Sequence, residues 1–115
     1  MLTNQIKSEK LKRSVEKILV KYPDRIPIIV EKHKTSNLSD LDRKNFLVSK
    51  NATIGQFLYI LRQRIKLNQK QALFIFINGT IPPTSMPISQ LYHEYKDSSD
   101  VLRVTYTDED TFGTF

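Results

Sequence analysis

The chain has 115 residues, of which 39% are hydrophobic and 26% charged, and its net charge is +6. This length and balance indicate one globular domain rather than a disordered chain. The absence of cysteine excludes disulfides, cysteine nucleophiles and thiolate metal sites. The sequence has no membrane-spanning apolar run and no secretory signal pattern, so we expect a cytosolic start.

The charge is unevenly distributed along the chain. Residues 1–25 contain seven Lys or Arg and three acids, whereas residues 94–110 contain six acids and two basic residues. A basic end can meet nucleic acid, an anionic membrane or an acidic peptide, or it can simply be a solvated helix face. We do not expect nucleic acid as the main partner, because the sequence has no aromatic–basic platform, zinc knuckle or base-reading motif.

The first half of the chain predicts one helix and a hairpin. Apolar residues at helical spacing predict a helix over residues 6–20, which ends before Pro23. Residues 25–32 form a β-branched strand in which Pro27 has to lie where no partner needs its amide. Residues 45–50 are a second short strand, which we expect to pair antiparallel with the first through a polar connection over residues 33–44.

The middle of the chain predicts a second helix. Thr53 is a suitable N-cap for a helix over residues 53–65, and Gln56 completes a capping box. The apolar run at residues 72–77 predicts a buried strand. Asn78-Gly79 then predicts a tight turn, and Pro82-Pro83 ends any return strand early.

The last part of the chain predicts a short helix over residues 88–95 and a final strand over 101–106. Residues 107–115 are polar and acidic, and we expect a flexible tail. The strand–strand–helix–strand–strand order after the first helix fits a β-grasp sheet with short connections. Periodicity alone does not distinguish this arrangement from other α+β folds.

The residue types give no support for an enzyme, a cofactor or a metal site. His33 and His93 are the only histidines, and no ligand spacing joins them to carboxylates. The three glycines form no nucleotide-binding loop. Asp40 and Asp42 are best interpreted as a solvated loop.

Gly113 lies two residues from the end of the sequence. A glycine on a flexible tail can enter a narrow active-site tunnel, because it has no side chain to clash. Its carboxylate can be activated and passed to an amine only after Thr114 and Phe115 are removed. Without further context, a lone glycine near a terminus is usually just a tail residue.

A long colinear set of segments resembles the small autophagy modifiers, the family of the GABA-receptor-associated protein and the microtubule-associated light chain three group. The resemblance covers about residues 14–113. The matching segments are, in order, 21–32 (KYPDRIPIIVEK), 40–44 (DLDRK), 46–48 (FLV), 53–57 (TIGQF), 72–76 (ALFIF), 81–84 (IPPT), 90–92 (QLY), 106–109 (YTDE) and 112–113 (FG).

The resemblance implies an α+β ubiquitin-like β-grasp, with a four-stranded mixed sheet on one central helix. It implies an N-terminal helical extension at residues 1–22, a ubiquitin-like domain at 23–107 and a processed flexible tail at 108–115. A cysteine protease would cleave after Gly113, and activating and conjugating enzymes would join Gly113 to phosphatidylethanolamine. The protein, a monomer, would then move from the cytoplasm to the periphery of autophagosomal membranes.

The resemblance also implies recruitment of cargo receptors and adaptors through peptides with an aromatic residue, two spacers and an aliphatic residue. Such a peptide would add a strand beside the second strand. The aromatic pocket would use Ile18, Pro27, Ile29, Leu47 and Val101. The aliphatic pocket would use Phe46, Val48, Phe57 and Ile60. Acids flanking the motif would meet Arg25, Arg43, Lys44 and Arg64, and a second docking face would lie at Phe74, Ile75, Phe76 and Ile77. Each apolar position could instead be plain core, and each basic one a solvated surface.

The sequence departs from its relatives near the aromatic pocket and at the N-terminus. Ser14 stands where many relatives have an acid, and Asn45 where many have a basic residue. The N-terminal region is a few residues short, so we expect the first of the usual two helices to be truncated. Two alternative functions stay open: a soluble peptide-binding scaffold in membrane trafficking that is not conjugated, and a nucleic-acid binder.

Overall fold

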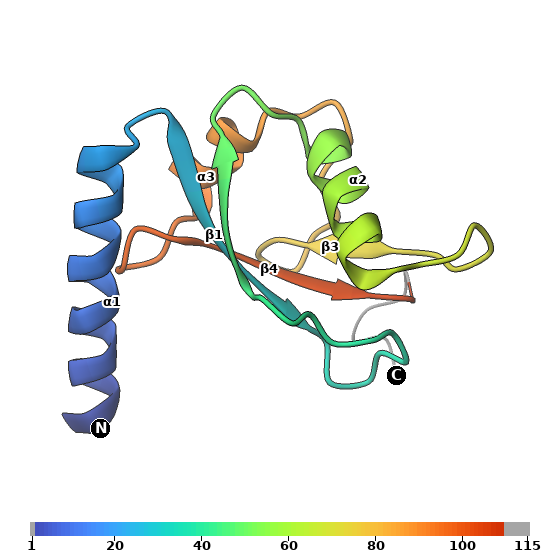
Figure 1. Cartoon of the computed structure of the whole chain (residues 1–115), viewed down its shortest axis with the longest axis horizontal. Helices are drawn as coiled ribbons and strands as arrows, with labels where there is room; N and C mark the ends of the chain where they lie inside the picture. Colours follow the sequence, from blue (N-terminus) through green and yellow to red (C-terminus); the bar gives the residue numbers. More distant parts are fainter. Residues whose placement is uncertain (1, 110–115) are drawn as a thin grey trace.

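The structure is a computed structural model that describes residues 2–109, with side chains from residue 7 onward. Three helices and four strands follow one another in the predicted order (Figure 1). Their bounds are α1 Leu2–Lys21, β1 Arg25–Lys32, β2 Asn45–Ser49, α2 Ile54–Ile65, β3 Phe74–Phe76, α3 Ile88–Tyr95 and β4 Leu102–Thr107.

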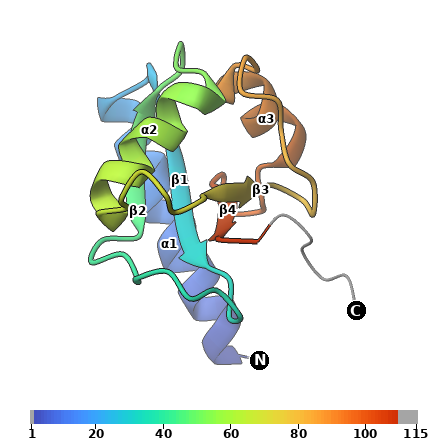
Figure 2. The same cartoon turned by 90° about the vertical axis from the view of Figure 1, so that its right-hand side faces the viewer.

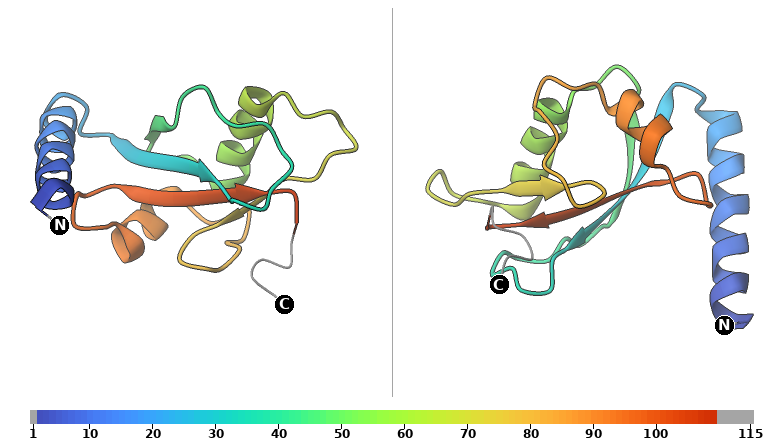
Figure 3. Two further views of the ribbon diagram at one scale, coloured as in Figure 1. Left: turned by 90° about the horizontal axis from the view of Figure 1, so that it is seen from below. Right: turned by 180° about the vertical axis from the view of Figure 1, so that it is seen from behind.

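The four strands form one mixed sheet in the order β2-β1-β4-β3. The central pair, β1 and β4, is parallel, and the two outer pairs are antiparallel. Helices α2 and α3 cover the same face of the sheet (Figure 2), whereas α1 lies across one end of it (Figure 3). The predicted β-grasp, a mixed sheet around one central helix with an N-terminal helical extension, is confirmed.

The alternation of residues along β1 determines what each side of the sheet contacts. Ile26, Ile28 and Val30 are buried in the core under α2. Pro27 and Ile29 lie between them and therefore face the opposite side, toward α1. Pairing with β4 begins at Ile28, so the missing amide hydrogen of Pro27 leaves no ladder position empty.

Helix α2 fills the concave face of the sheet. Its Thr53 hydroxyl accepts a hydrogen bond from the Gln56 amide, and the Gln56 side chain accepts one from the Thr53 amide, which confirms the predicted capping box. The buried stripe of the helix joins the core of β1 and β4. Its members are Ile54, Phe57, Leu61 and Ile65.

The connection between β1 and β2 is anchored to the core although its sequence is mostly polar. Leu38 and Leu41 are buried in the core cluster. The fully buried Tyr106 donates a hydrogen bond from its hydroxyl to the carbonyl oxygen of Ser39 at 2.7 Å. Burial, with the nearby Asp40 carboxylate, raises the pKa of Tyr106 to about 12, so the phenol stays protonated and continues to donate.

The sequence pattern starts the flexible tail at residue 107, which is one residue too early, whereas the resemblance places Thr107 in the ubiquitin-like domain. Thr107 belongs to β4 and is buried. The Asp108 carboxylate accepts hydrogen bonds from the Ser36 hydroxyl and the Asn37 amide, and the pKa of Asp108 is lowered because these donors outweigh its desolvation. Residues 110–115 lie outside the described part of the chain.

Two further elements differ from their predicted extents. The predicted strand at 72–77 is limited to Phe74–Phe76, because its partner β4 ends at Thr107, opposite Phe74. Asn78 and Gly79 make the predicted turn with positive φ angles of 52° and 77°, but the return is a single bridge between Ile77 and Thr80.

Helix α1 is one continuous helix of 20 residues, so the described part of the chain shows no separate truncated first helix. The helix ends where Pro23 follows Tyr22. None of the helices in the described part is long and apolar enough to cross a membrane.

Candidate functional site

A cavity of about 490 Å³ lies between α1 and the face of the sheet opposite α2. The apolar stripe of α1 faces this cavity, and Val15, only 3% exposed, fixes the helix against the sheet. The structure brings together all five residues predicted for the aromatic pocket: Ile18, Pro27, Ile29, Leu47 and Val101. A cavity of this volume with an apolar floor can accept a bulky aromatic side chain.

A second hollow, of about 890 Å³, lies on the other side of β2, between that strand and α2. Three residues predicted for the aliphatic pocket line it: Phe46, Val48 and Ile60. Phe57 does not, because it is fully buried in the core. Its ring packs edge-on against that of Phe46 at a centroid distance of 5.9 Å, so Phe57 supports the hollow from beneath.

Strand β2 forms the ridge between the two hollows. Leu47 is 41% exposed and lines both of them. The amides of Val30 and Lys50 donate across the β1–β2 pair to the carbonyls of Lys44 and Asp24. Because antiparallel pairs alternate between bonded and non-bonded positions, even-numbered β2 residues bond to β1. The Leu47 amide and carbonyl therefore point to the outer edge of the sheet, where a further strand can add.

The rim of both hollows is positively charged. Arg43 and Arg64 line the first hollow, and Arg25 and Arg64 line the second. Lys44 is exposed next to Arg43 but lines neither. Among the described residues, these four basic side chains make no ion pair, and neither lining contains an acid. The groove is thus suited to a peptide with acidic flanks.

Several lining residues were not predicted as contacts. Leu11 lines the first hollow one helical turn before Val15. Ser14 and Asn45 also line it, and both are among the positions at which the resemblance implies a difference from many family members. Tyr59, 64% exposed, lines the second hollow with Thr84. An aromatic residue at an exposed helix position, just before Ile60, was the signal that could have identified Tyr59.

The predicted second docking face is not exposed. Ile75, Phe76 and Ile77 are all buried, and only Phe74 is partly accessible. The reason is that β3 pairs with β4 and directs apolar side chains into the protein. Among these four side chains, only Phe74 is therefore accessible to a partner, and the second docking face stays a prediction.

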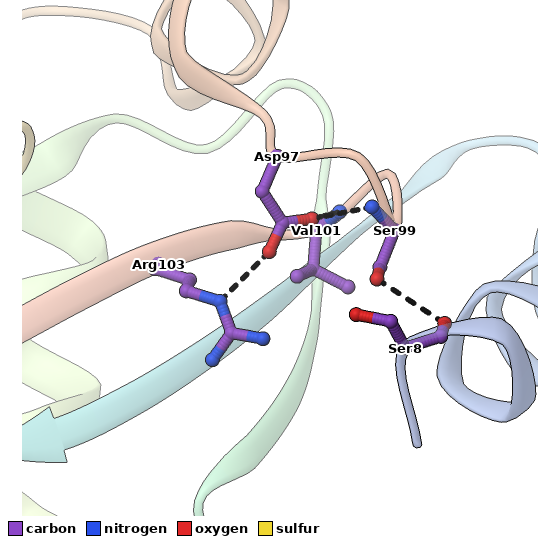
Figure 4. A network of polar contacts seen from close by, with 5 residues as sticks. All are labelled: Ser8, Asp97, Ser99, Val101 and Arg103. Carbon is purple, nitrogen blue, oxygen red and sulfur yellow. Dashed lines mark hydrogen bonds and ion pairs between the residues drawn. The ribbon is translucent and has the colours of Figure 1, made fainter. Parts of the chain in front are cut away.

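The loop before β4 holds Val101 in the first hollow. One Asp97 carboxylate oxygen accepts hydrogen bonds from the amides of Ser99 and Val101, and the other accepts one from Arg103 at 2.7 Å (Figure 4). The Ser99 hydroxyl lies 3.5 Å from the Ser8 carbonyl oxygen of α1. Partial burial acts to raise the pKa of Asp97, but the Arg103 side chain and the amides of Ser99 and Val101 together lower it below its ordinary value.

Gly113 lies outside the described residues. Within the described part of the chain, no group of His, Asp or Glu side chains is arranged to hold a metal ion.

Comparison with known proteins gives consistent matches over nearly the whole chain. A family model described as "Autophagy protein Atg8 ubiquitin like" matches residues 10–113. Autophagy-related protein 8d of Arabidopsis thaliana is 46% identical over 107 residues, which cover 93% of this chain and 89% of that protein. Autophagy-related protein 8 of Neurospora crassa is also 46% identical, over 93% of this chain and 88% of that protein. The crystal structure of Trypanosoma brucei ATG8 is similar with a TM-score of 0.85 and 40% identity, over 92% of this chain and 91% of that one.

Replacement of Asp97 with Asn tests the loop that positions Val101. The side-chain amide oxygen of Asn can still accept hydrogen bonds from the backbone, but the side chain then has no second oxygen to accept one from Arg103. We expect a loss of about 1 kcal/mol of unfolding free energy at pH 7. Because the pKa of Asp97 is lowered in the fold, this advantage of the wild type is present above about pH 4 and disappears as the pH falls further. Urea unfolding of both proteins between pH 2 and 7 measures this difference in unfolding free energy.

Glu94→Gln is the matched control, because Glu94 is exposed on α3 and makes no ion pair among the described residues. Its stability should follow the wild type at every pH. A constant difference between the wild type and Asp97→Asn down to pH 2 would contradict the assigned role of the carboxylate.

Proposed function

This chain belongs to the Atg8 family of ubiquitin-like autophagy proteins, and we propose that it acts as a membrane-attached modifier that recruits proteins bearing short peptide motifs. In this proposal the chain is cleaved after Gly113, and the new carboxylate is joined to phosphatidylethanolamine. The bound motif has an aromatic residue, two spacers and an aliphatic residue. The observation that carries the docking part is the free edge of β2 between two hollows on opposite faces of the sheet.

The spacing of such a motif matches the placement of the hollows. In an extended strand, side chains alternate between faces, so residues i and i+3 point in opposite directions and lie about 10 Å apart. A peptide strand added beside Leu47 can therefore direct its aromatic residue toward α1 and its aliphatic residue toward α2. Each buried anchor contributes roughly 1.5–3 kcal/mol before ordering costs.

The charges around the groove suit the residues that flank the motif. Arg43 and Lys44 directly precede β2, and Arg25 is paired with Ser49 at its end. Arg64 of α2 lines both hollows. Acidic residues before or after the two anchors would meet these side chains. Such exposed pairs contribute more to selectivity and association rate than to affinity.

Attachment through Gly113 would make the domain membrane-bound without any apolar segment of its own. A cysteine protease would hydrolyse the Gly113–Thr114 bond, and the activating and conjugating enzymes would supply the cysteine thiols for the thioester stages, since this chain has none. The phosphatidylethanolamine amine would displace the last thiol and form an amide. One acyl chain anchors a protein only marginally, whereas a two-chain lipid holds it firmly on the autophagosomal membrane.

The alternative function, a scaffold in membrane trafficking that is not conjugated, rests on a specific observation. Every residue that lines the two hollows lies between Leu11 and Val101, so the groove is complete without the tail. A monomer in the cytoplasm could bind motif peptides through this groove. Membrane attachment therefore has to be tested separately from peptide binding.

Replacement of Gly113 with Ala tests conjugation. The added methyl group hinders entry into the processing and conjugating sites, and we expect the variant to stay out of the membrane fraction of starved cells while it binds motif peptides with unchanged affinity. Thr114→Ala is the matched control, since cleavage removes the substituted residue. If Gly113→Ala reaches membranes as well as Thr114→Ala does, the conjugation proposal is wrong and the scaffold becomes the better account.

Replacement of Leu47 with Ala tests the groove. Loss of this ridge side chain removes apolar contacts to both anchors, and we expect binding of an aromatic-x-x-aliphatic peptide to weaken by about tenfold, measured by titration calorimetry. Ile81→Ala is the control, because Ile81 is a similarly exposed aliphatic residue that lines neither hollow. Equal affinities of the two variants would place the docking site elsewhere.

A further inference from the structure

A third hollow, of about 480 Å³, lies where the end of α1 meets the start of β1 and the end of β2. It is lined by two short segments that are distant in sequence, residues 21–25 and residues 49–51. Unlike the two hollows of the groove, it is lined mainly by polar and charged side chains. The antiparallel pairing of β1 with β2 brings the two segments together, because Arg25 is paired with Ser49 and the Lys50 amide donates a hydrogen bond to the Asp24 carbonyl oxygen.

The charge of this third hollow is mostly uncompensated. Lys21, Arg25 and Lys50 line it, with Asp24 as the only acid in its lining. Asp24 pairs with Lys50 at 3.2 Å, although both side chains are exposed. The Lys21 ammonium lies 5.4 Å from the centre of the Tyr22 ring and has no carboxylate partner among the described residues. Two cationic side chains thus remain available to an anionic ligand.

The third hollow continues the groove along β2. It shares Arg25 and Ser49 with the second hollow. The first hollow is lined by β2 residues 45–47 and the second by residues 46–49. A peptide whose aromatic residue occupies the first and whose aliphatic residue occupies the second therefore runs parallel to β2. Its next residues pass Ser49 and arrive at the third hollow.

We propose that this third hollow binds acidic side chains that follow the aliphatic residue of the docked motif by about two to four positions. The inference rests on the proposed docking function and adds a selective contact after the motif. A strand advances about 3.3 Å per residue, so a carboxylate at these positions reaches Lys21 and Arg25. Asp24 opposes this contact, because its carboxylate repels the ligand and occupies Lys50.

The test compares two synthetic peptides that share the same motif and differ only after it, one continuing with Glu residues and the other with Gln residues. We expect the Glu peptide to bind about fivefold more tightly at low salt, and the difference to shrink at 0.5 M salt. Lys21→Gln should reduce this preference by about half or more, since Lys21 lines only the third hollow. Asp24→Asn should increase it.

Lys34→Gln is the control, because Lys34 is an exposed cation beyond the opposite end of β1 and lines none of the three hollows. It should leave the preference for the Glu peptide unchanged. Equal binding of the two peptides to the wild type overturns this inference and leaves the docking groove intact. The same preference in Lys21→Gln and Lys34→Gln also overturns it, whereas failure of both peptides to bind overturns the groove itself.

Discussion

The hydrogen-bonded pairing of β1 with β2 is the constraint from which the rest of the site follows. Even-numbered residues of both strands bond to each other and point their side chains into the core under α2. Odd-numbered residues of β2 are therefore left with outward-facing backbone groups and with side chains on the α1 side. A shift of one residue would exchange these faces, bury Leu47 and expose Val48, and remove both hollows at once.

This constraint also explains why α1 is needed although it adds little to the core. The odd-numbered face of β1 has no other helix to cover it, and Val15 and Ile18 turn an open sheet face into a walled hollow. The Asp97 loop closes the same hollow from the opposite side through Val101. In the proposed function, peptide docking would therefore depend on an N-terminal helix outside the β-grasp itself.

Much of the fold was predictable from local signals. The apolar periodicity, the capping box at Thr53 and the Asn78-Gly79 turn each predicted the correct element. The length of β3 was not predictable, because it depends on where its partner strand β4 ends, which is determined by the tertiary structure. Thr107 was missed for a similar reason, since a polar residue in a strand is buried only if its neighbours cover it.

The site was predicted in part, through the family resemblance. Helical periodicity could not show that Phe57 is buried while Ile60 lines a hollow, because apolar residues three apart are neighbours on a helix surface and their exposure depends on what packs over each one. The burial of Ile75, Phe76 and Ile77 was likewise not predictable from the sequence, because it too depends on what packs over them. The third hollow was not predicted from the sequence, because only the pairing of β1 with β2 brings residues 21–25 next to residues 49–51.

In the proposed function, a domain with a peptide groove is joined to a lipid through Gly113. The most direct measurement is the intact mass of the protein from the membrane fraction of starved cells of its own source. We expect a chain that ends at Gly113 and carries one phosphatidylethanolamine. The unprocessed mass in both the membrane and the cytosolic fractions would contradict it.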